Sequence, residues 1–468
     1  MQTIQTDFSK GTIPRNILRL AVPMILAQLI NVLYSVVDRM YIGHLPDASA
    51  DALTGIGITF PIISIVTAFA NLFGMGGSPL FSIERGKGNH AQAEVILGNT
   101  FTLLVGTGIF LTVAVLLVKR PLLYLFGASD ITFPYANGYL TIYLCGSVFV
   151  MISLGLNQFI NAQGFGRTGM MTVALGAAIN LALDPLFIFV FNMGVQGAAA
   201  ATLIAQFCSA LWALCFLTGK RVPIRLRAGR MKLLPSLVRR IIGLGMSGFI
   251  MSITNGAVQI VCNATLQLYG GDLYVGVMTI INSVREVASA PMNGVTSAAQ
   301  PVIGFNYGAK EYARVRTGIK FMTFLCVGYT TAVWLFVLAF PELLIRIFNN
   351  DPSLVSAAVP AMHVYFFGFF MMSLQMSGQT AAVALGKSKQ AIFFSLLRKA
   401  MIVIPLTLLL PRLFGLGVNG VFWAEPISNF IGGGACYLTM LFTIWKELKR
   451  NEKQNSVLQE KNTENSVT

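Results

Sequence analysis

The sequence has few charged residues. Only 11% of its 468 residues are Asp, Glu, Lys or Arg, whereas soluble domains carry about 25%. With 55% hydrophobic residues and a mean hydropathy of +0.70, the chain cannot cover itself with polar surface in water. The deficit excludes a soluble enzyme, a nucleic-acid-binding protein and a disordered scaffold, and it indicates a protein of the lipid bilayer.

Residue patterns for metal, disulfide or nucleotide chemistry are also missing. The six cysteines occur singly in apolar segments, without a CxxC pair or a histidine at ligand spacing, and we expect them to be buried small hydrophobic residues. Gly386-Lys387-Ser388 does not end a phosphate loop, because Ala381 stands where that motif needs glycine. No nucleophile–base arrangement is present. We therefore expect neither an enzymatic activity nor a cofactor.

Long apolar segments, in contrast, recur along the whole chain. Twelve of them reach the roughly 20 residues that a helix needs to cross a bilayer. They must be helical, since backbone groups in hydrocarbon have to satisfy their own hydrogen bonds. We expect an all-α polytopic membrane protein with about 12 transmembrane helices. The segments cover 16–42, 52–82, 93–117, 131–160, 168–191, 194–218, 236–268, 273–305, 315–341, 355–385, 391–413 and 417–444.

The basic residues predict the orientation in the membrane. The net charge is +15, and eight Lys and Arg lie between Gly219 and Arg240 without an acid among them. Because Lys and Arg collect in cytoplasmic loops, we expect both termini in the cytoplasm of a multi-pass protein of the cell membrane. The segment before the first span contains Asp7 and lacks a small-residue cleavage pattern, so we expect no removable signal peptide.

The two halves of the chain contain an internal repeat. Gly74 corresponds to Gly294 at an offset of 220, and Ala162-Gln163-Gly164 corresponds to Ala384-Leu385-Gly386 at an offset of 222. Each half has an even number of spans, so the repeats are parallel and predict two pseudo-symmetric six-helix bundles around a central cavity. The expected parts are a cytoplasmic N-terminus at 1–15, an N-terminal lobe at 16–218, a basic cytoplasmic linker at 219–235, a C-terminal lobe at 236–444 and a cytoplasmic tail at 445–468.

A few ionisable residues lie inside the spans of the N-terminal lobe, where each is a functional candidate. Asp38 lies about one turn from the outer end of the first span, and Asp184 and Thr202 lie about two turns from the outer ends of theirs. Asn180 shares the helix face of Asp184. These oxygens could bind a small cation, or the two carboxylates could share a proton. Alternatively, Asp38 pairs with its neighbour Arg39, and Asp184 only accepts backbone hydrogen bonds at a proline kink.

The C-terminal lobe carries different chemistry. The repeat partner of Thr202 is Glu425, and the segment that corresponds to Asp184 has no acid. Coupling is therefore expected mainly in the N-terminal lobe, while Glu286, Arg398 and Glu425 form either internal salt bridges or a substrate site. Pro23 lies inside the first span, where it allows a bend next to Asp38, or only a static kink.

Several motifs together resemble those of the multidrug and toxic compound extrusion family, in its DinF-like branch of bacterial exporters. The resemblance covers the chain to about residue 445. The motifs are Pro23 with Asp38-Arg39-Met40-Tyr41-Ile42-Gly43, Asn180-Leu181-Ala182-Leu183-Asp184-Pro185, Gly194-Val195-Gln196-Gly197-Ala198, and Gln300-Pro301-Val302-Ile303-Gly304-Phe305-Asn306-Tyr307-Gly308-Ala309.

The resemblance implies a secondary antiporter that exports lipophilic, often cationic drugs and dyes in exchange for Na⁺ or H⁺. It implies small-molecule and bilayer partners. The clustering of the basic residues argues against a nucleic-acid partner, and we expect the protein to act as a monomer. Residues matching Asp38, Asn180, Asp184 and Thr202 would bind the cation, Na⁺ included, with the carbonyl of Ala198. The positions that it associates with the cavity are Tyr34, Tyr139 and Asn157. The sequence has no clear equivalents of the C-terminal acids used in another branch.

A lipid-linked precursor flippase of a related bilobed family is the alternative. Such proteins tend to have extra spans and a strongly basic central cavity. The acids among the N-terminal candidates and the number of spans favour drug export.

Overall fold

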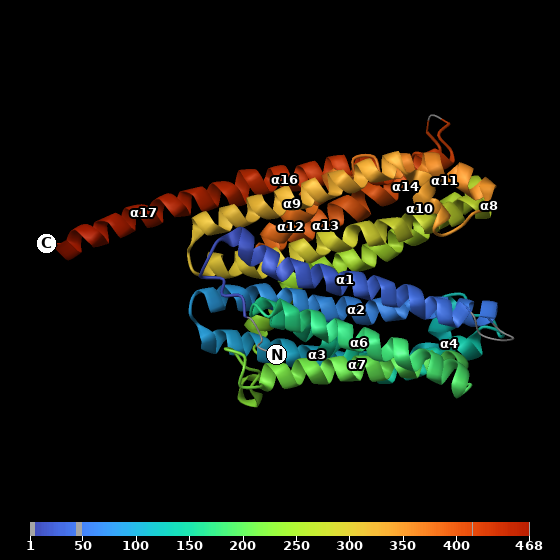
Figure 1. Cartoon of the computed structure of the whole chain (residues 1–468), viewed down its shortest axis with the longest axis horizontal. Coiled ribbons are helices and arrows are strands. Elements are labelled where there is room, and N and C mark those ends of the chain that lie inside the picture. Colours follow the sequence, from blue (N-terminus) through green and yellow to red (C-terminus); the bar gives the residue numbers. More distant parts are fainter. Residues whose placement is uncertain (1–4, 44–48, 414, 468) are drawn as a thin grey trace. The chain divides into compact units, whose positions relative to one another are not determined.

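The computed structural model describes residues 5–43, 49–413 and 415–467. The side chains at 35, 36, 38–40, 42, 43, 49–51, 53 and 458–467 lie outside this description. Within it, every regular element is a helix (Figure 1), so the expected all-α fold is confirmed.

The first half of the chain contains helices of very different lengths. They are α1 (Ile13–Gly43), α2 (Ser49–Gly86), α3 (His90–Leu125), α4 (Phe133–Cys145), α5 (Ser147–Ala162), α6 (Gly166–Pro185), the π-helix η1 (Leu186–Val190), α7 (Gly194–Thr218) and the 3₁₀ turn η2 (Ala228–Arg230).

Helices of the second half include three further π-helical segments. The elements are α8 (Pro235–Gly308), α9 (Tyr312–Ala339), α10 (Pro341–Arg346), α11 (Pro352–Tyr365), α12 (Phe369–Ala384), α13 (Ser388–Leu396), the π-helix η3 (Leu397–Val403), α14 (Ile404–Leu409), α15 (Val418–Ser428), the π-helix η4 (Asn429–Gly433), α16 (Gly434–Met440), the π-helix η5 (Leu441–Trp445) and α17 (Lys446–Val467).

The helices are numerous and apolar enough for the expected membrane fold. In the described chain, nine are long and apolar enough to cross a membrane, or eleven when each of two bent pairs counts as one span. Helix α8 contains two helices that meet at Gly271, where φ is +66°, and counting both brings the number to twelve. A glycine is needed there because L side chains rarely adopt this backbone conformation.

Two of the apolar segments are bent rather than straight. Helices α4 and α5 meet at 54° around Gly146, and α11 and α12 meet at 46° next to Gly368, whose φ is +66°. Both glycines leave room for a neighbour: a Cβ on Gly146 would lie 2.9 Å from Cγ of Leu203, and one on Gly368 would lie 2.3 Å from the ring of Phe430. At both bends, the glycine therefore packs against a residue that is far away in the sequence.

The chain forms two compact units that are not consecutive in sequence. Helices α1, α2 and α8 each pass from one unit to the other, and in α1 the change falls at Pro23. Unit 1 contains residues 5–6, Pro23–Phe81 and His90–Ile253; unit 2 contains Asp7–Val22, Ser82–Asn89 and the described residues from Thr254 onward.

In unit 1, α2 and the beginning of α8 cross in backbone contact. A Cβ on Gly245 would lie 1.7 Å from the carbonyl oxygen of Leu72, and one on Gly76 would lie 2.1 Å from that of Ile241. Small residues at such crossings let membrane helices approach closely. The core beside the crossing contains Phe81 and its neighbours.

The basic linker is docked onto unit 1. Glu94 on α3 pairs with Arg227 at 3.2 Å and with Arg230 at 3.9 Å. Gln163 exchanges two hydrogen bonds with the backbone of Ile224: its Nε2 donates to the carbonyl at 3.0 Å, and its Oε1 accepts from the amide at 3.2 Å. The linker is thus an ordered part of the unit.

In unit 2, the segment before α1 is tied to the ends of α8 and α9. Arg314 donates to the carbonyl of Phe8 at 2.9 Å and to Oδ1 of Asn306 at 2.7 Å. The guanidinium of Arg85 lies 5.0 Å from the ring of Phe8 and 5.2 Å from that of Phe305, distances at which a cation interacts with aromatic faces.

All six cysteines are free, and the expectation that all are buried is wrong for some of them. Cys262, Cys326 and Cys436 are buried, but Cys145 and Cys215 are exposed. Helices in lipid place small apolar side chains on their outer surfaces as well as inside the protein.

Candidate functional site

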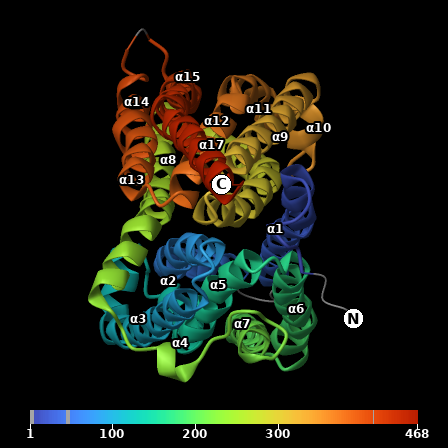
Figure 2. The same ribbon diagram turned by 90° about the vertical axis from the view of Figure 1, so that its left-hand side faces the viewer.

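A polar cluster in unit 1 is built by α6 and α7, which pack along each other (Figure 2). The chain reverses through Asn192 and Gly194, both in the left-handed region with φ of +51° and +53°. Gly176 then allows close contact, because a Cβ there would lie 2.5 Å from Oγ of Ser209. This turn places the end of α6 against the beginning of α7.

Three of the residues expected to bind a cation meet between these helices. Nδ2 of Asn180 donates to Oδ1 of Asp184 at 3.3 Å and to Oγ1 of Thr202 at 3.2 Å. Their exposed fractions are 1%, 0% and 6% respectively. Ala198, whose carbonyl is a further expected ligand, is buried one turn before Thr202 on α7.

The cluster offers hard oxygen donors. Oδ1 of Asn180 is buried and has no hydrogen-bond partner among the described residues. Together with the Asp184 carboxylate and the Thr202 hydroxyl, it forms the kind of donor set that a small hard cation prefers. These residues fit Na⁺, and the carboxylate could equally hold a proton.

Of the other predicted residues of the first half, Tyr34 and Tyr139 are described on their own helices, Asn157 lies at a distance from this group, and the side chain of Asp38 is not described. The side chain of Asp38 lies outside the described residues, although its backbone is part of α1. Tyr34 is half-buried on α1, and Tyr139 is buried on α4, stacked on Tyr143 at 6.3 Å between ring centroids. Asn157 on α5 faces Gly169, which is about 16 Å along α6 from Asn180.

Pro23 is buried within α1. It lacks the amide hydrogen that would continue the helical ladder, so α1 has a weak point at this position. The bend itself stays a prediction.

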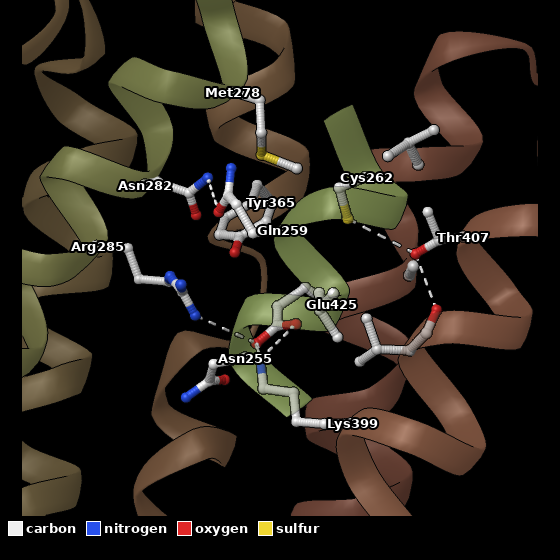
Figure 3. A pocket seen from close by; sticks show the side chains of 14 residues that line it. Asn255, Gln259, Cys262, Met278, Asn282, Arg285, Tyr365, Lys399, Thr407 and Glu425 are labelled. Carbon is white, nitrogen blue, oxygen red and sulfur yellow. Dashed lines mark hydrogen bonds and ion pairs between the residues drawn. The ribbon is translucent and has the colours of Figure 1, made fainter. Parts of the chain in front are cut away.

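A second polar cluster lies in unit 2, where Glu425 on α15 accepts hydrogen bonds from two basic residues of η3. Figure 3 shows one of them, Lys399, beside Glu425. Oε1 of Glu425 is 2.8 Å from Nη2 of Arg398 and 2.9 Å from Nζ of Lys399, which also donates to Oε2 at 3.1 Å. Nη1 of Arg285 on α8 is 4.0 Å from the same carboxylate. The side chains of Glu425, Arg398 and Lys399 are at most 6% exposed, whereas that of Arg285 is 27% exposed.

The π-helical geometry explains how two consecutive residues reach one carboxylate. Neighbouring residues of an α-helix point about 100° apart, and the wider turn of a π-helix reduces this angle. Arg398 and Lys399 both lie in η3, and Asn429, which accepts from Nη1 of Arg398 at 3.0 Å, begins η4. Such segments occur frequently at functional sites.

Glu286 does not belong to this cluster. It is exposed on α8 and forms no salt bridge within the described residues, whereas its neighbour Arg285 does. Arg398 forms a salt bridge with Glu425, and an internal salt bridge is one of the two arrangements expected for these residues. The sequence prediction missed Asn429, although its spacing of four from Glu425 places both on one helix face.

A pocket opens beside Glu425. Its enclosed space is narrow and continues into a part that is open to solvent. Arg285 and Lys399 line it, together with the amides of Gln259 and Asn282 and the phenol ring of Tyr365. Small-molecule sites combine such a concave space with a few polar groups that fix orientation.

The fold and the two clusters define a polytopic helical membrane protein with buried charged groups inside its helix bundles, as transport proteins have. The chain belongs to the MatE family. The model of that family matches residues 23–186 and again 248–409, once in each half of the chain.

Curated relatives extend over nearly the whole chain. Multidrug export protein MepA of Staphylococcus saprophyticus is 23% identical over 440 residues, which cover 94% of this chain and 95% of that protein. The protein of the same name from Staphylococcus aureus (strain N315) is 24% identical over 443 residues, with 94% and 95% covered.

Solved structures share the fold. One is described as the outward-facing conformation of a multidrug resistance MATE family transporter of the MOP superfamily; it is 20% identical, with a TM-score of 0.89, and the match covers 96% of this chain and 100% of that one. A MOP superfamily transporter from Pyrococcus furiosus is likewise 20% identical with a TM-score of 0.89, and 96% and 99% are covered. At this identity, the likeness shows the fold alone.

Proposed function

We propose that the protein is a secondary multidrug exporter, which moves lipophilic, often cationic compounds out of the cell in exchange for Na⁺ or H⁺. Its family and the names of its curated relatives support the export of drugs. The observation that carries the coupling is the buried group of Asn180, Asp184 and Thr202. We propose a transporter and not an enzyme.

Coupling follows from the cost of a buried carboxylate. An ionised Asp184 in a bundle interior is unfavourable by several kcal/mol unless its charge is compensated. Binding of Na⁺ or a proton from outside removes that charge, with Asn180 and Thr202 supplying further oxygens to Na⁺. Loss of the charge would favour a state in which α1 bends at Pro23 and the drug leaves. Release of the cation to the cytoplasm would then return Asp184 to its ionised, cation-free form.

The proposed setting is the bacterial cell membrane, with both termini in the cytoplasm. The organisms of the curated relatives and the basic linker support this arrangement. We further propose that a single chain is sufficient for transport, since the coupling group lies within one unit of one chain.

Ethidium efflux from loaded cells tests the proposal. Asp184→Asn and Asp38→Asn should each abolish efflux while the protein stays in the membrane, because an amide can neither release a proton nor carry the charge that attracts a cation. Asp351→Asn, on an exposed loop, is the matched control and should leave efflux unchanged. Efflux by Asp184→Asn at the normal rate would refute the site.

The ion is tested by imposing gradients separately. Purified protein in vesicles should expel ethidium in response to a Na⁺ gradient or a pH gradient. Efflux that responds to neither would contradict antiport.

A specific feature favours a second function, the flipping of a lipid-linked precursor. Three basic residues surround Glu425 in unit 2, and a negatively charged lipid headgroup would be attracted to them. A fluorescent lipid-translocation assay on the same vesicles distinguishes the two functions.

A further inference from the structure

The cluster around Glu425 contains more positive than negative charge. Arg285, Arg398 and Lys399 all lie within 4.0 Å of this one carboxylate. Guanidinium groups stay protonated in proteins, so the two arginines exceed the single carboxylate even when Lys399 is neutral. The excess is one charge in that case and two when Lys399 is protonated. Buried charges are costly unless they are paired, so an excess is unusual for a purely structural cluster.

Several donors of the cluster are not used by the protein itself. Nε of Arg398 is buried without a hydrogen-bond partner in the described chain. Arg285 approaches its carboxylate only at 4.0 Å, beyond hydrogen-bonding distance, and its side chain is 27% exposed. Both carboxylate oxygens of Glu425 already accept hydrogen bonds from the closer cations, Arg398 and Lys399. The arginine of α8 therefore has donors available for another acceptor.

The available donors of Arg285 border the pocket. Arg285 and Lys399 line it, whereas Arg398 does not, and Figure 3 shows the side chain of Arg285 extending from α8 toward Glu425, with Asn282 and Gln259 beside it. Nδ2 of Asn282 donates to Oε1 of Gln259 at 2.8 Å, and Nε2 of Gln259 donates to Oδ1 of Asn263 at 3.1 Å, which orders both amides of the lining. A negatively charged oxygen group in this space can reach the guanidinium of Arg285.

Part of the remaining wall is apolar. Met278, Val403 and Val421 line the same space as the basic residues, while Asn255, Thr407 and the Glu425 carboxylate add polar groups to it. A free inorganic ion would leave this wall in contact with water, whereas an organic molecule with one charged end would cover it. The combination of walls fits an amphipathic ligand.

We propose that this pocket of unit 2 binds the singly charged oxyanion of an amphipathic molecule, with Arg285 and Lys399 contacting the oxygens and Met278, Val403 and Val421 contacting the apolar part. The oxyanion is a carboxylate of a small solute or the phosphodiester of a lipid headgroup. The inference rests on the proposed function in one respect: the ligand is taken to be a transported compound. It extends the expected range of substrates from lipophilic cations to molecules that carry a negative group.

Binding to the purified full-length protein in detergent tests the proposal. The probes are dansylglycine, a fluorescent carboxylate, and dansylglycinamide, its neutral analogue. Dansylglycine should bind saturably and about tenfold or more tightly than the amide, because charged hydrogen bonds to the arginine are lost with the charge. Equal binding of the two probes would overturn the proposal.

Variants locate the site. Arg285→Gln should weaken dansylglycine binding about tenfold without affecting the amide, and Arg285→Lys should retain part of the affinity. Arg285 is the least buried of the three cations, and thermal melting of each variant shows whether it is folded. Arg346→Gln, on the exposed helix α10, is the matched control and should bind as the wild type does. Unchanged binding by a folded Arg285→Gln would also overturn the proposal.

Competition distinguishes the two sources of the oxyanion. Displacement of dansylglycine by octanoate alone supports a solute carboxylate, and displacement by short-chain phosphatidylglycerol at similar concentration supports a lipid headgroup. Displacement by neither contradicts the site. Asp184→Asn should bind dansylglycine normally, so loss of ethidium efflux with intact probe binding separates failure of coupling from failure of this pocket.

Discussion

Individual residues differ sharply between the two buried polar clusters. Asp184 receives a hydrogen bond from a neutral amide, whereas Glu425 is surrounded by three cations. The cations around Glu425 compensate its charge within the protein. The two carboxylates therefore differ in their surroundings, and we propose coupling at Asp184 and a structural charge at Glu425.

Replacement of Glu425 should mainly affect stability. Among the described residues, Glu425 is the one carboxylate bonded to Arg398 and Lys399, and breaking such a buried pair by Glu425→Gln costs about 3–5 kcal/mol. The variant should melt at a lower temperature in detergent, and its efflux per folded molecule should fall less than that of Asp184→Asn.

A second substitution provides the control for this prediction. Adding Lys399→Met to Glu425→Gln lowers the excess from three positive charges to two, the excess that the wild type has with Lys399 protonated, so part of the lost melting temperature should return. A double variant no more stable than Glu425→Gln would contradict the charge argument.

At the scale of elements, the crossing of α2 and α8 depends on the absence of a side chain. Gly245→Ala would place its Cβ 1.7 Å from the carbonyl oxygen of Leu72, which belongs to a helix backbone and cannot rotate away. We expect a loss of about 1–3 kcal/mol or more in unfolding free energy. Thermal melting of the purified protein measures it.

Gly106→Ala is the matched control. It is exposed on α3, and a Cβ there would meet nothing within 4 Å. Alanine has the higher helix propensity, so this variant should be as stable as the wild type or slightly more stable. Equal effects of the two substitutions would rule out a steric role of the crossing.

The beginning of α11 depends on a carboxylate cap. Oδ1 of Asp351 accepts from the amides of Ser353 and Leu354, and the hydroxyl of Ser353 is the main cause that lowers the pKa of Asp351 below its usual range. A lowered pKa means that the charged form stabilises the fold above the unfolded value and that this contribution is lost as pH falls through the folded value. Asp351→Ala should therefore lower the melting temperature at neutral pH.

The pH dependence is the test of this cap. The difference between Asp351→Ala and the wild type should shrink as the pH is lowered below the usual carboxyl range, about pH 4. Asp351→Asn keeps the capping geometry and should remain close to the wild type. A difference that persists unchanged at low pH would contradict the argument.

The elements also show what sequence alone could provide. The extent of α7, Gly194 to Thr218, and the spacing of Asn180 and Asp184 follow from local patterns of apolar residues and helix faces. The bends at Gly146 and Gly368 do not, because the chain has 45 glycines and these two act through packing partners far away in sequence.

The unit 2 cluster was predictable only in part for a similar reason. A buried arginine and glutamate predict pairing, but the π-helical segment η3, which brings the directions of Arg398 and Lys399 closer together, has no clear sequence signal. Arg285 joins from α8, more than a hundred positions earlier in the chain.

At the scale of the whole molecule, the distribution of basic residues predicts which loops face the cytoplasm. With the native cysteines replaced, Arg412→Cys should react with a membrane-impermeant maleimide in intact cells, because this loop is expected outside. Arg225→Cys in the basic linker should react only after permeabilisation. Labelling of Arg225→Cys in intact cells would reverse the proposed orientation.

The exchange of segments between the two units has a consequence for how the chain must be made. Unit 1 includes residues up to Ile253, so a ribosome that has just finished the linker has not yet supplied all of it. Unit 2 includes Asp7–Val22, which is synthesised early. This segment cannot pack into its unit until the residues from Thr254 onward have been synthesised. A gene divided at the linker would therefore yield two fragments that each lack part of their own unit, and neither should mature without the other.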